Sequence, residues 1–173
     1  MPESNQKRSV DWFYFQGKAG RNRIQEPDLE FNTWYMQLYL NPASIDLFKK
    51  LQESPEANCE GILNQLKSDN NGEFAYFRRP MVRKWNGTEK PLSPPVVLDK
   101  DDKPTNDFIG LGSDVTVKVE RYKFRRPFGK GRGSAIRLLG IKIDNLIPAE
   151  IDELSGDQQK NAQGLPEHPP QKW

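Results

Sequence analysis

The stretch VERYKFRRPFGKGRGSAIRLLGIKI, residues 119–143, decides the fold. It extends a run that alternates apolar and polar residues from Val115 onward, and its glycines separate this run from a second alternating segment. Alternation with a period of two is typical of half-buried β-strands, and glycines clustered between two such runs favour a hairpin turn. We therefore predict two long strands, over 109–124 and 134–147, joined by a glycine-rich turn.

The second of these strands changes its pattern part-way along. Ile136 and Leu138 alternate in one register, whereas Ile141 and Ile143 alternate in the other. One extra residue in a strand moves every later side chain to the opposite face. We therefore predict a β-bulge near Leu139-Gly140.

An alternating segment also lies upstream, in EFNTWYMQLYL (30–40). One face of the expected strand carries four large apolar side chains, and the other carries two tyrosines (Trp34, Met36, Leu38 and Leu40 against Tyr35 and Tyr39). Helical spacing follows over 41–53, and Ser54-Pro55 is a typical start for a second helix over 55–67. The sequence therefore predicts a strand followed by a helix pair.

Two further strands are expected before the hairpin. GEFAYFRRPMVRKW (72–85) predicts a strand that ends or bends at Pro80, because proline interrupts a sheet ladder. Residues 86–107 are rich in proline, aspartate and lysine and read as an extended connection, with a short buried strand over 96–98.

These elements together favour a small, mostly β barrel or sandwich with a pair of short helices. A chain of 173 residues is long enough for one domain with a substantial core. We assign residues 10–147 to that domain and residues 1–9 to a flexible N-terminus. Residues 148–173 are acidic, contain prolines and lack hydrophobic periodicity, so we expect a mobile tail.

The composition argues against a membrane protein and against an enzyme. No run approaches twenty apolar residues, and the N-terminus has no apolar signal core, so we expect an intracellular protein. A single cysteine, Cys59, and a single histidine, His168, supply neither a disulfide nor a zinc site nor a placed catalytic base. The glycines of 129–133 lie between two strands, unlike those of a phosphate-binding loop, and the acids of 99–102 read as a surface loop. We expect no catalytic residue, no metal and no cofactor.

The net charge of +2 hides an asymmetry along the chain. Nine basic residues and one acid, Glu120, lie between Lys118 and Lys142, whereas six acids and two bases lie between Asp144 and Trp173. Such a distribution bears on partners rather than on fold. A solvated strand face with a solubilising tail would show the same pattern, so charge alone leaves both interpretations open.

Aromatic residues are interleaved with the basic charge in 118–137 and again in 76–85. A single nucleic acid strand offers phosphates to cations, and its unstacked bases can lie on aromatic rings for about 1–3 kcal/mol each. Any one of these rings could equally pack on the core, but their repetition over several strands favours a binding surface. Duplex binding fits less well, because the predicted helices carry mixed charge.

We predict that two sets of side chains form this surface. The basic set would line an electrostatic groove, and the aromatic set would supply platforms for bases. The basic set is Arg78, Arg79, Lys84, Lys118, Arg125, Arg126, Lys130, Arg132 and Arg137; the aromatic set is Tyr35, Tyr39, Tyr76, Trp85, Tyr122 and Phe124.

These segments carry a resemblance to a known family. DFIGLGSDVTVKVERYKF (107–124), preceded by KPLSPPVVLD (90–99) and followed by the glycine-rich turn, resembles the single-stranded DNA-binding proteins of tailed bacteriophages of the T7 type. The WYMQLYLNP strand (34–42) and the RRP after the next strand (78–80) add to the resemblance, which covers roughly 10–147. It implies an oligonucleotide/oligosaccharide-binding (OB) fold, a five-stranded β-barrel with an inserted helix pair.

The resemblance also implies partners and a setting. The ligand would be single-stranded DNA, in replication, recombination and repair in the cytoplasm of the infected bacterial host, with no membrane partner. In the family an acidic tail with a terminal aromatic residue competes with DNA and recruits phage or host replication proteins. Trp173 would be that aromatic, although the tail acids of 150–157 are not adjacent to it. Self-association on the DNA stays open.

Two other interpretations of the basic hairpin remain. An RNA-binding or anti-restriction protein would use the same surface, because discrimination rests on contacts to the 2′-hydroxyl. A protein–protein adaptor or structural phage protein would instead present the hairpin to an acidic partner.

Overall fold

The computed structural model of this 173-residue chain describes residues 12–53, 59–85, 87–125 and 132–149. Residues 126–131 of the predicted glycine-rich turn, the N-terminus and the tail from 150 onward lie outside the described residues, whereas Gly133 lies in a strand. The described part is mostly β-strand with one α-helix, which confirms the mostly β fold class expected from the sequence.

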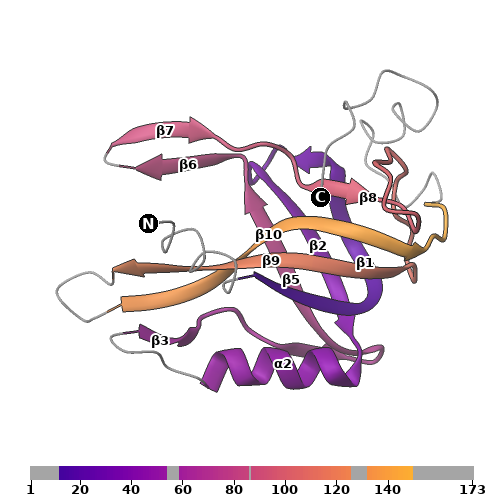
Figure 1. Cartoon of the computed structure of the whole chain (residues 1–173), viewed down its shortest axis with the longest axis horizontal. Coiled ribbons are helices and arrows are strands. Elements are labelled where there is room, and N and C mark those ends of the chain that lie inside the picture. Colours follow the sequence, from indigo (N-terminus) through magenta and orange to yellow (C-terminus); the bar gives the residue numbers. More distant parts are fainter. Residues whose placement is uncertain (1–11, 54–58, 86, 126–131, 150–173) are drawn as a thin grey trace, which may run out of the picture.

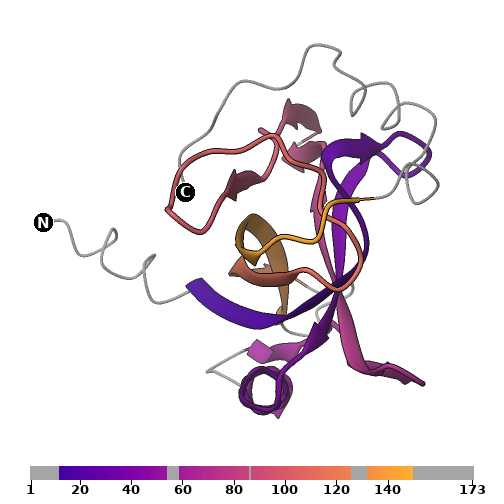
Figure 2. The ribbon, with the colours of Figure 1, turned by 90° about the vertical axis from the view of Figure 1, so that its right-hand side faces the viewer.

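Strands β1, β2, β5, β9 and β10 cross the middle of the molecule, with α2 beneath them (Figure 1). Turning the view by 90° shows α2 end-on below the curved strands (Figure 2). The described elements are β1 (Trp12–Asp28), β2 (Thr33–Leu40), α2 (Pro42–Glu53), β3 (Cys59–Ile62), β4 (Lys67–Asp69), β5 (Gly72–Pro80), β6 (Val82–Trp85), β7 (Thr88–Pro91), β8 (Val96–Leu98), β9 (Asp114–Arg125) and β10 (Arg132–Asn145).

Eight of the described strands form one sheet, in the order β3-β10-β9-β1-β2-β5-β4, with β8 paired to β10 beside this path. Strands β9 and β10 are antiparallel partners, from Arg125 opposite Arg132 to Asp114 opposite Asn145. Their register shifts between Leu138 and Gly140. The structure therefore confirms both the predicted pair of long strands and the bulge in the second of them.

The sheet curls until β5 comes beside β10. Arg79 Nη1 donates a hydrogen bond to Leu138 O at 3.3 Å, and Arg79 Nε donates one to Ser93 O at 2.7 Å. No backbone ladder among the described strands joins the two ends of the sheet. The five-stranded closed barrel that the resemblance implied is therefore not seen, and a side chain bridges the open seam instead.

The core lies between the inner face of the curled sheet and α2. Phe15 is fully buried, with its ring centroid 5.7 Å from that of Phe48 on α2 and 5.3 Å from that of Phe77 on β5. The alternating apolar residues of β2, β9 and β10 surround this trio. Three elements therefore meet at one phenylalanine.

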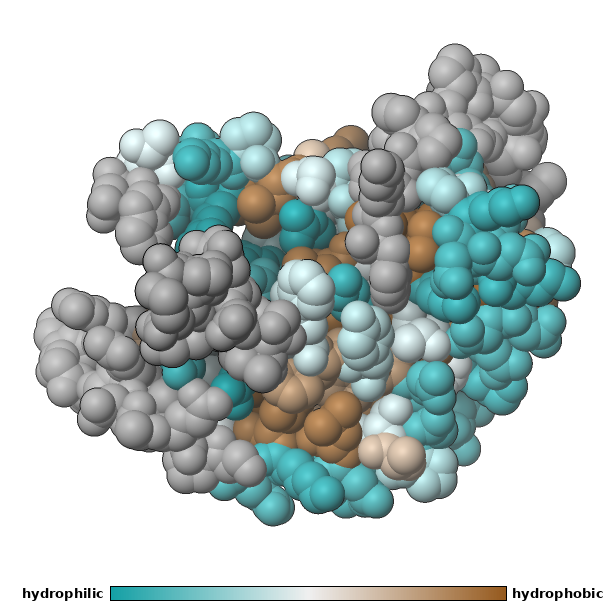
Figure 3. All heavy atoms as spheres, viewed as in Figure 1, coloured by the Kyte–Doolittle hydropathy of each residue, from teal (hydrophilic) through white to brown (hydrophobic). Residues whose placement is uncertain are grey.

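Helix α2 covers the lower end of the core. Asn41 caps it, because Ser44 N donates a hydrogen bond to Asn41 Oδ1 at 2.9 Å. Phe48 and Leu51 are buried, and Figure 3 shows hydrophilic side chains along the outer edge of the helix. No helix among the described residues has the length and apolarity that a bilayer crossing requires.

The second predicted helix is wrong over 59–67. Strand β3 runs parallel to β10 there, and Leu63 N donates a hydrogen bond to Ser134 O at 2.9 Å. Gly61 lies against the end of α2, where a Cβ atom would come within 1.8 Å of Gln52 O. Pairing with the free edge of β10 has overridden a local apolar spacing that suited a helix.

Strands β6 and β7 form a separate two-stranded hairpin that stands away from the main sheet (Figures 1 and 3). The sheet ladder of β5 ends at Pro80, as the sequence predicts, and the chain turns at Met81 before β6. Leu92 N donates to Met81 O at 2.8 Å, and Met81 N donates to Asn32 O at 2.9 Å. These bonds fix the base of the hairpin beside the turn between β1 and β2.

Candidate nucleic-acid interface

The outer face of β2 and β5 carries the first aromatic cluster. Because alternate residues share a face, Tyr35 and Tyr39 point away from the buried side of β2. In the antiparallel pair Tyr35 lies opposite Arg78, and Tyr39 lies opposite Phe74. Tyr76 falls between them, with its ring centroid 6.2 Å from that of Tyr35. Local strand pairing thus gathers three tyrosines.

Strand β1 adds positive charge beside these rings. Its register places Arg23 opposite Tyr35 and Lys18 opposite Tyr39. Arg21 is exposed on the same strand. Phosphates can therefore find cations on the same face that offers rings to the bases.

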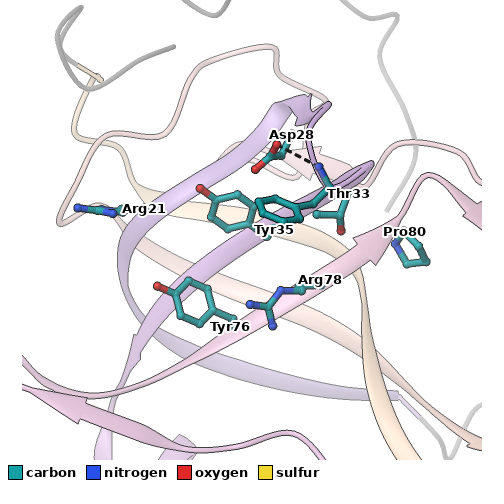
Figure 4. Close-up of a pocket in the computed structure, with 8 residues that line it drawn as sticks. Arg21, Asp28, Thr33, Tyr35, Tyr76, Arg78 and Pro80 are labelled. Atoms are coloured by element: carbon teal, nitrogen blue, oxygen red, sulfur yellow. Dashed lines mark hydrogen bonds between the residues drawn. The ribbon is translucent and has the colours of Figure 1, made fainter.

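A pocket of about 610 Å³ opens next to the turn between β1 and β2 (Figure 4). The Arg78 guanidinium lies 4.9 Å from the centre of the Tyr76 ring, a cation–π distance. We call this cavity the turn pocket; it is lined by Arg21, Asp28, Phe31, Thr33, Tyr35, Tyr76, Arg78 and Pro80.

Phe31 is the most exposed ring in the turn pocket. Its side chain is 70% exposed, on the turn that follows Asp28. A phenylalanine left in water at a pocket rim is available to a stacking partner.

A second cavity, of about 870 Å³, lies between the β6–β7 hairpin and the ends of β9 and β10. It brings together side chains from strands that are distant in the sequence. We call it the hairpin groove; it is lined by Asn64, Arg78, Pro80, Val82, Arg83, Lys84, Tyr122, Lys123, Phe124, Ala135, Ile136 and Arg137.

The rings of the hairpin groove are positioned by strand pairing. Tyr122 and Phe124 are two residues apart on β9, with centroids separated by 6.2 Å. Phe124 lies across Gly133 of β10, where a Cβ atom would come within 2.5 Å of its ring, so a larger residue there would displace the ring. The Arg137 guanidinium lies 4.9 Å from the centre of the Tyr122 ring.

A third cavity, of about 730 Å³, continues the surface on the other side of Tyr76. Tyr39, Asp69 and Asn71 contribute to its lining. It shares Arg21 and Tyr76 with the turn pocket, and the turn pocket shares Arg78 and Pro80 with the hairpin groove. The three cavities therefore form one aromatic and basic tract.

Burial and neighbouring charges shift the pKa values of two side chains along this tract, Tyr35 and Arg79. Burial raises the pKa of the Tyr35 hydroxyl, and the Asp28 carboxylate raises it further. Burial lowers the pKa of Arg79, as does the neighbouring Arg137, while Glu120 opposes both. Arg137 Nη2 and Glu120 Oε2 are 3.3 Å apart. The guanidinium groups of the seam are thus partly neutralised from within the protein.

Most of the predicted site residues whose side chains are described reach this tract. Those that line it are Tyr35, Tyr39, Tyr76, Arg78, Lys84, Tyr122, Phe124 and Arg137. Arg126, Lys130 and Trp173 lie outside the described residues, as do the side chains of Trp85, Arg125 and Arg132.

Two predicted cations lie elsewhere. Arg79 bridges the seam between β5 and β10, as described above. Lys118 is only 7% exposed, with Nζ 4.0 Å from the centre of the Trp12 ring and 6.0 Å from that of Tyr14. Burial lowers the pKa of Lys118. Lys118 lines none of the three cavities and lies instead beside the rings of β1.

Sequence reasoning missed several lining residues. Arg21, Arg83 and Lys123 are basic residues within or near the predicted clusters. Their positive charge could have added them to the predicted basic set. Phe31 lies an even number of positions from Tyr35, so it could have been predicted on the same face. Asp28 had no signal, because nothing in the sequence marks an acid as belonging to a basic surface.

The described residues contain no group of three or more His, Cys, Asp or Glu side chains that could hold a metal ion. The tract instead offers aromatic faces, guanidinium and ammonium groups, and backbone. That chemistry suits an unstacked polyanion.

Comparison with solved structures identifies the same fold in bacteriophage proteins. The single-stranded DNA-binding protein encoded by bacteriophage T7 matches 91% of this chain and 96% of its own, with a TM-score of 0.55 and 16% sequence identity. A C-terminal truncation of the single-stranded DNA-binding protein from bacteriophage Enc34 matches 82% of this chain and 89% of its own, with a TM-score of 0.51 and 12% identity.

The likeness confirms the resemblance found in the sequence at the level of the fold. No protein-family model matches the sequence, and no curated protein matches it. At these identities the architecture has been retained while most side chains differ.

Proposed function

We propose that this chain is a non-enzymatic protein that binds single-stranded DNA with little dependence on sequence. The observation that carries the proposal is the continuous tract on which Tyr35, Tyr76, Tyr122 and Phe124 alternate with Arg78 and Arg137. Rings accept any base, and guanidinium groups neutralise any phosphate. The T7 and Enc34 proteins of the same fold are single-stranded DNA-binding proteins, which supports this assignment.

The proposed path follows the three cavities in order. A strand would enter beside Tyr39, pass the turn pocket and continue below the β6–β7 hairpin. Arg78 would contact the backbone at the point where the turn pocket meets the hairpin groove. The exposed Lys84 on the hairpin would extend the positive field around the strand, and we expect Arg125, Arg126, Lys130 and Arg132, which the sequence predicts to belong to the basic set, to add to it.

A fluorescence-anisotropy competition with matched dT, rU and duplex DNA oligomers tests the proposal. We expect dT to bind more tightly than duplex, with a log–log salt slope of about −2 to −4, as for about three to five neutralised phosphates. Tighter binding of rU would favour the RNA-binding alternative. Absence of binding to every oligomer at moderate salt would overturn the proposal in favour of an adaptor.

The biological setting that we propose is phage DNA replication, recombination and repair in the cytoplasm of an infected bacterium. Coating single strands suits all three processes, because each exposes unpaired DNA. Phage or host replication proteins would be recruited through residues 148–173, with Trp173 as the contacting aromatic, and copies would associate along the DNA.

Deleting residues 149–173 is expected to tighten dT binding about three- to tenfold at low salt, since the segment carries five acids and two bases. The gain should fade at about 0.15 M salt, where charges are screened beyond about 8 Å. Anisotropy titrations at both salt concentrations measure it. The matched control replaces the five acids by their amides in the full chain and should reproduce the gain. Equal affinity with and without the segment would exclude competition.

A further inference from the structure

The turn pocket contains one carboxylate on an otherwise basic and aromatic surface. Asp28 lines the pocket together with Phe31, Tyr35 and two arginines. A carboxylate repels phosphate, so a surface that served only the backbone would be weakened by it. Its place in the lining therefore points to a contact with some other part of the ligand.

The hydrogen bonds of Asp28 leave acceptor positions unused. Oδ1 accepts from Glu30 N at 3.0 Å and more distantly from Phe31 N at 3.4 Å. A carboxylate offers about four acceptor positions, so at least two remain. No ion pair involving Asp28 occurs among the described residues. The second oxygen is turned toward the Tyr35 side of the pocket (Figure 4).

The charge of Asp28 acts on the pocket interior. Burial raises the pKa of the Tyr35 hydroxyl most, and the negative charge of Asp28 raises this pKa further, as expected for a carboxylate that lines the same pocket. The pocket therefore contains both kinds of charged group, two arginines and one carboxylate. A nucleotide can match both, because its phosphate is an acceptor and its base edge carries donors.

Donor patterns separate the four bases. Guanine presents two adjacent donors, N1–H and the N2 amino group, on its Watson–Crick edge. Adenine and cytosine present one amino group beside an acceptor, and thymine presents one N–H between two carbonyls. A carboxylate that only accepts is therefore complementary to guanine and is mismatched to thymine.

We propose that the turn pocket is a guanine subsite of the bound strand. Asp28 accepts hydrogen bonds from N1–H and N2–H of the base, and the rings of Phe31 and Tyr35 contact its faces. Arg21 and Arg78 hold the adjoining phosphates. A volume of about 610 Å³ is ample for one nucleoside. This subsite rests on the proposed function and adds a local base preference to sequence-tolerant binding.

Oligomers with isolated bases in a thymidine background test the subsite without forming G-rich structures. Three strands of about 12 nucleotides are compared. In the first, thymidine alternates with deoxyguanosine; in the second, thymidine alternates with deoxyinosine; the third contains thymidine alone. Inosine lacks only the N2 amino group. For the wild-type protein we expect the guanine strand to bind about tenfold more tightly than the thymidine strand, with inosine between them.

The decisive variant is Asp28→Asn. Asparagine keeps a side-chain oxygen for the turn and replaces the free acceptor by an NH₂ donor. The guanine-to-inosine affinity ratio should fall to about one, while affinity for the thymidine strand is kept or increased through loss of negative charge.

The matched control is Asp144→Asn, at a carboxylate that lines none of the three cavities. Its Oδ2 accepts a hydrogen bond from Thr116 Oγ1 at 2.8 Å. This variant removes the same charge and should keep the guanine-to-inosine ratio. Equal binding of the three strands by the wild type, or a ratio unchanged in Asp28→Asn, overturns the subsite alone. Failure to bind any strand overturns the proposed function with it.

Discussion

Replacing Tyr76 and Tyr122 together by alanine is expected to weaken binding of a dT oligomer by about 30- to 20,000-fold. The two rings belong to different cavities joined by Arg78, so a strand on the proposed path meets both. Each stacked base contributes about 1–3 kcal/mol, and each ring also positions a guanidinium over its face. Anisotropy titration with an oligomer of about 12 nucleotides measures the loss.

The matched control replaces both tyrosines by phenylalanine. This variant keeps the rings and the cation–π contacts and loses the two hydroxyls, so its affinity should stay within about threefold of the wild type if stacking dominates. An alanine variant that folds and binds dT as tightly as the wild type would show that the strand avoids these rings.

Replacing Phe15 by alanine is expected to lower the free energy of unfolding by about 3–5 kcal/mol. The side chain is fully buried and contacts rings on α2 and β5 from its place on β1. Its removal leaves a cavity where three elements meet, which none of them can fill alone. Urea denaturation followed by circular dichroism should show a lower midpoint with a similar slope.

Phe31→Ala provides the control for this effect. That ring is 70% exposed, so its loss should change the free energy of unfolding by less than about 1 kcal/mol. Similar losses of stability in the two variants would contradict the description of the core around Phe15.

Local patterns predicted the features that depend on neighbouring residues. The parity change between Leu138 and Ile141 marked the bulge correctly, because a shift of one residue moves apolar side chains between faces. The same reasoning placed α2 and the buried face of β2. Sequence also indicated the end of β5 at Pro80, because proline cannot continue the ladder.

Features that depend on distant pairing were not predicted. Strand β1 was not predicted at all, because Gly17 and Gly20 interrupt its apolar pattern. Gly17 is required by its partner strand, where a Cβ atom would come within 1.9 Å of Tyr39 O. The prediction of the second helix was wrong for a related reason, because residues 59–62 pair with the edge of β10 as a strand.

The candidate site shows the same difference between features with a local sequence pattern and features that depend on distant strand pairing. Charge and aromatic content identified Arg78, Tyr76, Tyr122 and Phe124 individually. Their meeting depends on the curl that brings β5 toward β10 and on the β6–β7 hairpin, and neither has a local signal. For Lys118 the local pattern misled, because it lies on the same face of its strand as Tyr122 and was therefore expected at the surface. In the structure it is buried against the rings of β1.

Photocrosslinking with dT oligomers that carry 5-iodouracil, followed by peptide mass spectrometry, tests the central claim most directly. The chemistry favours aromatic side chains in contact with the base and reports their positions. We expect crosslinks on both parts of the tract, at Tyr35 or Tyr76 and at Tyr122 or Phe124. Efficient crosslinking confined to residues outside the three cavities, or no crosslinking because the oligomer does not bind, would contradict the account.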